Sequence, residues 1–138
     1  MTARRFLDTN VLLYSVSTAE DEVAKRNRAL ALLDEGDCGL SVQVLQEFYV
    51  QATRPSREDA LSHEVACGLI RSWGRFEVQA ITLEVMTAAF EIKATHGFSY
   101  WDSAIVAAAR MLGCAELLTE DLSHGRRIDS VTIVDPFR

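Results

Sequence analysis

The sequence contains no apolar stretch that approaches the ~18 residues of a membrane-spanning helix. Its first residues lead straight into a predicted strand and include no apolar signal-peptide segment. Cysteine is scarce, with three residues and no CxxC spacing, so a disulfide framework is not indicated. We therefore expect a cytoplasmic protein that does not associate with a membrane and whose cysteines are reduced and buried.

The sequence also contains few basic residues. Lysine and arginine together number 14 against 20 acidic residues, which gives a net charge of −6. Proteins that hold nucleic acid through electrostatics are usually basic, so any such role would depend here on local patches or on metal ions. The three histidines are scattered, and none pairs with another at zinc-ligand spacing.

The sequence does contain a regular alternation of predicted strands and helices. Its 138 residues, of which 49% are hydrophobic, suit one domain that spans residues 1–138. Strands separated by helices pair in parallel, so we expect a layered α/β sheet of about five strands. The predicted strands are 6–7, 38–41, 76–81, 116–118 and 131–134, and the predicted helices are 9–16, 20–35, 41–52, 57–73, 82–95 and 99–112.

Turn and capping residues predict where several of these helices begin or end. Gly36 is placed to end the helix 20–35. Pro55 disfavours helical angles at the residue before it, and Ser56 with Asp59 three residues later predicts a helix that begins at 57. The body of the last helix, 104–109, is apolar on every side, which predicts packing on both faces.

Four acidic residues either follow a predicted strand or sit on the helix after one: Asp8, Glu47, Asp102 and Asp121. The carboxyl ends of parallel strands meet at one edge of a sheet, where ligands of open α/β folds bind, so all four can lie together. Each also has an ordinary structural explanation. Asp8 and Asp102 suit helix starts, while Glu47 could be a solvated edge residue and Asp121 a loop acid.

Converging carboxylates repel one another and raise each other's pKa unless a cation lies between them. An all-oxygen set suits Mg²⁺ or Mn²⁺, and such an ion supports phosphodiester hydrolysis without a side-chain nucleophile. Thr9 and Asn10 directly follow Asp8 and are placed to hold a water or to orient a carboxylate. The aromatic pair Tyr100 and Trp101 beside the third acid is expected to pack rather than to shield the edge of the site.

These residues, in this order, resemble the PIN-domain nucleases, and most closely their VapC-like toxin members. The resemblance implies a three-layer α/β/α sandwich with a mainly parallel sheet, and a metal-dependent endoribonuclease. It also implies an RNA substrate, a cognate antitoxin protein as partner, and a homodimer. The matching segments are Asp8-Thr9-Asn10 after the first strand, Glu47 on a middle helix, Asp102 at the start of a late helix, and Thr119-x-Asp121 after the fourth strand.

The resemblance also implies roles for individual residues. The four acids would be catalytic, and three of them, Asp8, Asp102 and Asp121, would be ligands of Mg²⁺ or Mn²⁺. Supporting contacts would come from Thr9, Asn10, Thr119 and Glu120. The adjacent pair Glu120 and Asp121 departs from the family's lone acid and leaves open which carboxylate faces the metal. Arg126 and Arg127 follow closely and either contact RNA or antitoxin or belong to a solvated loop.

Three other interpretations compete with the nuclease. A haloacid-dehalogenase-like phosphatase needs a second aspartate two residues after the first, where Asn10 stands, and a lysine near the site. Neither Lys25 nor Lys93 directly follows a predicted strand, and a phosphoacceptor receiver domain fails for the same reason. A catalytically silent PIN fold that acts only by binding is the remaining alternative, which would show no metal-dependent cleavage.

Overall fold

The computed structural model describes residues 4–138. Within them no helix has the length and apolar character needed to cross a membrane. The strands are β1 (Arg5–Leu7), β2 (Cys38–Ser41), β3 (Glu77–Gln79), β4 (Glu116–Leu118), β5 (Arg127–Ile128) and β6 (Val131–Val134). The helices are α1 (Thr9–Ser15), the 3-10 helix η1 (Glu20–Glu22), α2 (Val23–Glu35), α3 (Val42–Ala52), α4 (His63–Trp73), α5 (Leu83–His96) and α6 (Tyr100–Met111).

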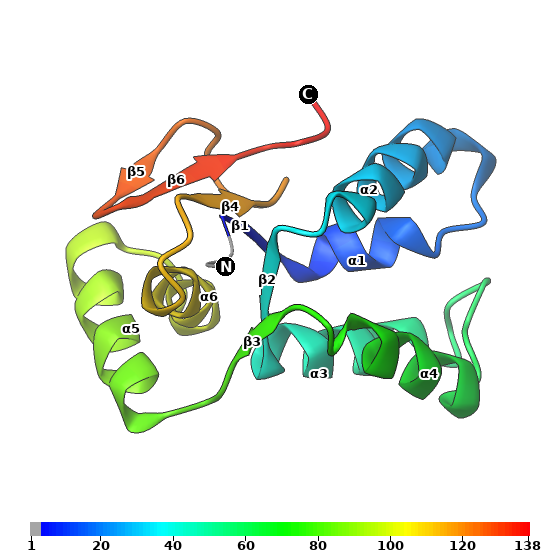
Figure 1. The fold of residues 1–138 in the computed structure, drawn as a ribbon, viewed down its shortest axis with the longest axis horizontal. Helices are drawn as coiled ribbons and strands as arrows, with labels where there is room; N and C mark the ends of the chain where they lie inside the picture. The colour runs from blue at the N-terminus through cyan, green and yellow to red at the C-terminus, as the bar shows by residue number, and fades with distance from the viewer. Residues whose placement is uncertain (1–3) are drawn as a thin grey trace.

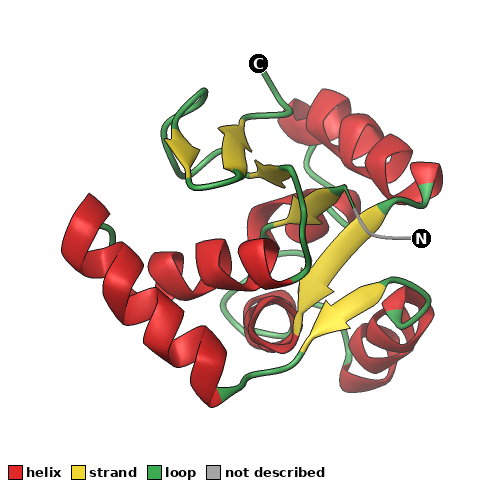
Figure 2. Ribbon diagram, turned by 60° about the vertical axis from the view of Figure 1, so that its left-hand side comes forward, coloured by secondary structure: helices red, strands yellow, loops and turns green. Residues whose placement is uncertain are grey.

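The strands form one sheet in the order β3-β2-β1-β4-β6-β5. All neighbours are parallel except β5 and β6. Helices α5 and α6 cover one face, and α1 to α4 lie on the other (Figure 1). A view turned by 60° also shows helices on both sides of the strands (Figure 2). The predicted three-layer α/β/α sandwich with a mainly parallel sheet is therefore confirmed.

The sheet has one strand more than the five that were predicted. The additional strand, β5, has only two residues and pairs antiparallel with β6 through Arg127 opposite Thr132 and Ile128 opposite Val131. The turn between them places Asp129 at a positive φ of 53°. Two residues are too few to show the alternation by which a strand is recognised in a sequence.

Strand β1 lies at the centre of the sheet, between β2 and β4. Its residues Phe6 and Leu7 are fully buried, because helices cover both faces of a parallel sheet. Leu7 pairs with Leu118, and the backbone N–H of Asp8 still donates to the Leu118 carbonyl at 3.0 Å. The ladder thus continues one residue past the strand and fixes where Asp8 lies relative to β4.

Helix α4 begins at His63, so the predicted start at residue 57 is wrong. Ser62, and not Ser56, is the N-cap, and its hydroxyl accepts from the Val65 N–H at 3.1 Å. Asp59 does not serve a first helical turn, because its Oδ2 accepts from the Thr18 N–H at 3.1 Å and from the Thr18 hydroxyl. The contact between Asp59 and Thr18, which are far apart in the sequence, therefore keeps the residues before α4 in turns rather than in a helix.

The cysteines match the expected burial at two positions out of three. Cys38 and Cys114 are buried, with 2% and 1% of their surfaces exposed, whereas Cys67 is half-buried. Cys67 faces His63 one turn earlier on α4, with its Sγ 3.7 Å from Nε2. The prediction of burial fails there because α4 presents Ala66 and Trp73 to the core instead.

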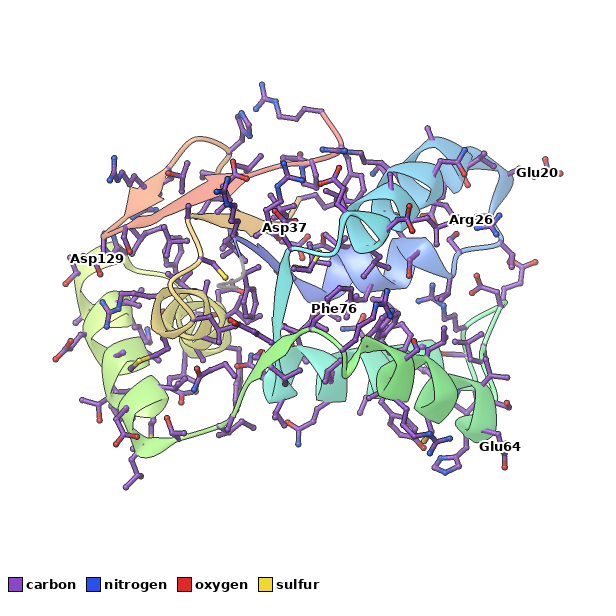
Figure 3. All side chains as sticks on the ribbon, in the orientation of Figure 1. Glu20, Arg26, Asp37, Glu64, Phe76 and Asp129 are labelled. Atoms are coloured by element: carbon purple, nitrogen blue, oxygen red, sulfur yellow. The ribbon has the colours of Figure 1, made fainter. Side chains whose placement is uncertain are left out.

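The core on the α3 side of the sheet is built around Phe48. This ring is fully buried and meets Trp73 of α4 edge-on, with centroids 4.8 Å apart. Phe76 lies in the interior, whereas the exposed acids Glu20 and Glu64 project from the periphery (Figure 3). Burial of these aromatic rings holds α3, which carries Glu47, against the sheet.

Replacing Phe48 by alanine is expected to lower the free energy of unfolding by about 3–5 kcal/mol, because it leaves a cavity in a closed core. Urea titration followed by tryptophan fluorescence measures this loss, since Trp73 contacts the removed ring. The control is Val50→Ala on the same helix, where 56% of the valine is exposed and a change within about 0.5 kcal/mol is expected. Equal effects of the two substitutions would contradict the described packing of α3.

Candidate active site

The candidate site lies where the strand order reverses. From β1 the chain proceeds to β2 and β3 on one side, whereas β4 and β6 lie on the other side. The carboxyl ends of β1 and β4 therefore flank a topological switch point, the place where open α/β sheets bind ligands. Asp8 directly follows β1, and Thr119 to Asp121 directly follow β4.

Asp8 is a buried carboxylate that joins these two strand ends. Only 5% of its surface is exposed. Its Oδ1 accepts from the Thr9 N–H at 2.7 Å, and its Oδ2 accepts from the Thr119 hydroxyl at 2.9 Å. Asp8 is also the N-cap of α1. The capping role expected for Asp8 is therefore confirmed, and it leaves a role in the site possible as the sequence predicted.

Asn10 ties α1 to the loop after β4. Its Nδ2 donates to Thr119 Oγ1 at 2.9 Å and to Asp121 Oδ2 at 3.1 Å. Its Oδ1 accepts from the backbone N–H of Glu120 at 3.4 Å. The Asp121 N–H donates to the same Thr119 hydroxyl oxygen at 3.1 Å. One amide thus holds Thr119 and Asp121 in place beside Asp8.

Glu47 reaches this cluster from α3. Its Oε1 accepts from the Thr9 hydroxyl at 3.4 Å and from Gln43 Nε2 at 3.5 Å. Gln43 Nε2 also donates to the backbone carbonyl of Trp101 at 3.1 Å, which connects α3 to the start of α6. Sequence reasoning missed Gln43, although its position one turn before Glu47 on the same helix face was an available signal.

Asp102 lies in the first turn of α6. Its backbone N–H donates to the Ser99 hydroxyl at 3.1 Å, so the capping expected for this helix start is present. Burial is the main cause of the raised pKa of Glu47, and repulsion from the Asp102 carboxylate adds to it. The neighbouring Trp101 does not pack as expected, because 65% of its surface is exposed.

The electrostatics of the cluster are those of acids that lack a counter-charge. Burial raises the pKa of Asp8 from 3.8 to about 7, against the lowering by its hydrogen bonds from Thr9 and Thr119. Repulsion from Glu47 and Asp121 adds to the rise. Burial likewise raises the pKa of Glu47, with the bonds from Gln43 and Thr9 opposing it. A cation in the cluster would offset these costs.

Of the adjacent pair, Asp121 faces the cluster and Glu120 does not. Glu120 accepts a hydrogen bond from the Tyr14 hydroxyl, and its Oε2 accepts from Lys25 Nζ at 2.9 Å. Lys25 also donates to the Tyr14 hydroxyl at 3.2 Å. On the outer side Phe137 meets Tyr14 edge-on, with centroids 4.9 Å apart. Glu120 therefore anchors the loop after β4 to α1 and α2.

Arg127 lies on β5, the strand at the far edge of the sheet, and Arg126 directly precedes it. Arg126 Nη2 donates to the His96 carbonyl at 3.2 Å, and its guanidinium lies over Phe98 at 4.5 Å. Arg127 pairs with Thr132, a position level with the amino end of β1 rather than with Asp8. The hydrogen bonds of Arg126 hold it against the chain that follows α5, and contact with RNA or antitoxin stays a prediction for both.

The chemistry of the donor set fits a hard divalent cation. The cluster supplies carboxylate, amide and hydroxyl oxygens, which Mg²⁺ and Mn²⁺ prefer. Among residues 4–138 no three acidic, histidine or cysteine side chains are close enough to form a complete metal cage. Mg²⁺ does not need one, since it is typically held by one or two carboxylates together with waters and phosphate oxygens.

Comparisons with known proteins agree with this fold. The PIN domain family matches residues 5–128, and the chain belongs to this family. A search of curated proteins finds no match. Similar solved structures include a toxin–antitoxin complex from Klebsiella pneumoniae (18% identity, TM-score 0.70, 96% of this chain and 97% of that chain), FitAcB from Neisseria gonorrhoeae (19%, 0.68, 96% and 98%), and Mycobacterium tuberculosis VapC20, described as a sarcin–ricin loop cleaving toxin (21%, 0.65, 82% and 86%).

The raised pKa of Asp8 predicts how the stability of the metal-free protein depends on pH. Below about pH 4 the carboxyl is protonated in both the folded and the unfolded chain. As pH rises from 4 to 7, the unfolded chain releases this proton more readily than the folded one, so the free energy of unfolding falls. Asp8→Asn, which cannot ionise and still caps α1, is expected to remove this part of the decline.

Urea titrations in EDTA at several pH values between 4 and 8 measure the effect. As pH rises, the free energy of unfolding of Asp8→Asn minus that of wild type should increase by up to about 1.4 kcal/mol per pH unit. Glu64→Gln, at an exposed acid on α4, is the control and should follow the wild-type curve. Parallel curves for wild type and Asp8→Asn would show that Asp8 is ionised as easily as an exposed acid.

Proposed function

We propose that this chain is a divalent-metal-dependent endoribonuclease and the toxin of a toxin–antitoxin pair. The observation that carries the proposal is the buried carboxylate of Asp8 at the switch point, with Glu47 and Asp121 near enough to repel it and Asp102 acting in turn on Glu47. Burial of a carboxylate among other acids is unfavourable unless a cation offsets their charge. Such a cluster is well suited to phosphodiester hydrolysis with Mg²⁺ or Mn²⁺.

In this proposal the metal would lie among Asp8, Asp102 and Asp121, with one or two of these carboxylates as direct ligands and waters or phosphate oxygens completing the shell. When bound, Mg²⁺ or Mn²⁺ supplies Lewis-acid stabilisation of charge on the phosphate and a more acidic water. The protein's own contribution is positioning. Asn10 and Thr119 fix the carboxylates of Asp121 and Asp8 by the hydrogen bonds described above.

Glu47 is assigned the role of general base, which accepts a proton from the attacking water. Its raised pKa brings it closer to neutral pH, where a carboxylate becomes a more effective general base. The hydrogen bonds from Thr9 and Gln43 both reach Oε1 and orient the carboxylate. Its Oε2 can then take the proton of the attacking water.

The partners belong to the same proposal. Membership of the PIN domain family and the likeness to toxin–antitoxin structures support a cognate antitoxin as partner. The description of VapC20 as a sarcin–ricin loop cleaving toxin supports RNA as the substrate. A homodimer completes the proposal.

The decisive experiment is cleavage of a panel of structured and unstructured RNAs, including tRNA and rRNA, by antitoxin-free protein. Wild type is expected to cut in Mg²⁺ or Mn²⁺ and not in EDTA. Asp8→Asn and Asp102→Asn should each lose at least about a hundredfold in rate, because charge stabilisation by the metal is worth several kcal/mol. Glu64→Gln is the matched carboxylate-to-amide control and should cleave as wild type does.

Two results would count against the proposal. Full activity of both site variants would show that the reaction takes place elsewhere. Absence of cleavage across the whole panel, in protein free of antitoxin, would favour the catalytically silent PIN fold that acts only by binding.

Metal binding can be tested separately from cleavage. Mn²⁺ at about a hundred times its dissociation constant should stabilise wild type by about 2.7 kcal/mol, since it binds the folded chain only. The thermal unfolding midpoint should rise accordingly in wild type and less in Asp8→Asn and Asp102→Asn. A rise of equal size in the variants would place the metal outside the acid cluster.

A further inference from the structure

Trp101 is an exposed aromatic residue beside the acid cluster. It precedes Asp102 in α6, and 65% of its surface is exposed, although an indole ring is unfavourable in water. Its carbonyl accepts from Gln43, and Tyr100 meets its ring edge-on with centroids 5.0 Å apart. The indole is therefore held in place next to the site while most of it stays open.

Trp101 also forms one wall of a cleft between α3, the chain that follows β3, and α6. The lining includes three glutamines, two aromatic rings and an exposed isoleucine but no charged side chain: Gln43, Gln46, Gln79, Ile81, Tyr100 and Trp101. Gln43 connects this cleft to the acids, because the same amide nitrogen contacts Glu47 and the Trp101 carbonyl.

The lining combines two kinds of group that recognise nucleobases. Flat aromatic rings stack on unpaired bases, and side-chain amides pair with base edges. Gln46 is exposed and makes no hydrogen bond with the described residues, so its amide is free for a ligand. Stacking needs no positive charge, which matters in a chain with a net charge of −6.

We propose that this cleft binds an unpaired base of the RNA next to the cleaved phosphate, with the base stacked on Trp101 and its edge facing the glutamine amides. The inference rests on the RNA cleavage proposed above and adds to it a nucleotide-selecting subsite. It assigns Trp101 to the substrate rather than to a protein partner. The two assignments differ in what they require: a partner needs apolar bulk, whereas a base needs a flat aromatic face.

Fluorescence tests binding without cleavage. The chain has two tryptophans, and Trp73 is buried with 4% of its surface exposed, so quenching by RNA reports on Trp101. Short single-stranded oligoadenylate and oligouridylate, added in EDTA, are the probes. Single strands should quench the emission, and a perfectly paired RNA duplex should not, because its bases are already stacked.

Kinetics with a cleaved RNA test the role in the reaction. Trp101→Leu keeps apolar bulk but lacks a flat ring on which a base can stack. KM should therefore rise roughly 5- to 100-fold, the fold-change expected for the loss of one base stack. Trp101→Phe should stay within about threefold of wild type. Leu83→Ala is the control, since this leucine is 74% exposed near the cleft but is not part of its lining. Gln46→Leu should alter the preference between bases.

The outcomes separate this inference from the proposed function. If wild type cleaves RNA but shows no quenching and Trp101→Leu keeps its KM, the subsite is wrong and the nuclease stands. If single strands quench the fluorescence but no RNA is cut, base binding stands and the nuclease fails. A third pair of results would overturn the inference and make Trp101 a contact between copies of the chain. The tryptophan emission would shift to the blue as the protein concentration rises, and a dimer would be lost in Trp101→Ala but kept in Trp101→Leu.

Discussion

The hydrogen bond between the Asp8 carboxylate and the Thr119 hydroxyl joins the ends of the two central strands, and the rest of the site is arranged around it. Burial of β1 between β2 and β4 brings Asp8 into the interior, where water cannot solvate its charge. Asn10 then extends the contact to Asp121, and Thr9 extends it to Glu47 on a third element. The same packing that stabilises the sheet thus creates a concentration of acids that the fold alone does not need.

Much of this arrangement could be predicted from the sequence, because it follows from local periodicity and from general rules of sheet topology. Strands that alternate with helices pair in parallel, and parallel strands bring their carboxyl ends to one edge. The details that escaped prediction depend on contacts between distant residues. The start of α4 is decided by Asp59 and Thr18, and the orientation of Glu120 by Tyr14 and Lys25.

If this acidic chain acts on RNA, as proposed above, it must hold the RNA by means other than a basic surface. Arg126 lies over Phe98 and bonds the His96 carbonyl, so part of the chain's small supply of positive charge is used internally. Attraction for phosphate would then come from the metal, and contact with the bases from aromatic and amide groups. In such a protein, loss of the cation removes the attraction for phosphate and stops catalysis, whereas stacking of the bases persists without it, and added salt weakens binding less than it does for a basic protein.

The cluster of Tyr14, Lys25 and Glu120 connects the carboxyl end of the chain to the site. Phe137 packs on Tyr14, and Arg28 Nε donates to the Pro136 carbonyl at 3.2 Å, so the last residues lie against α1 and α2. The loop that carries Asp121 is thereby held both by Asn10 and by this cluster. An affinity tag joined after Arg138 would start within a few residues of these contacts. Such a tag can therefore disturb the loop that carries Asp121, and the choice of chain end for a tag affects measurements of activity.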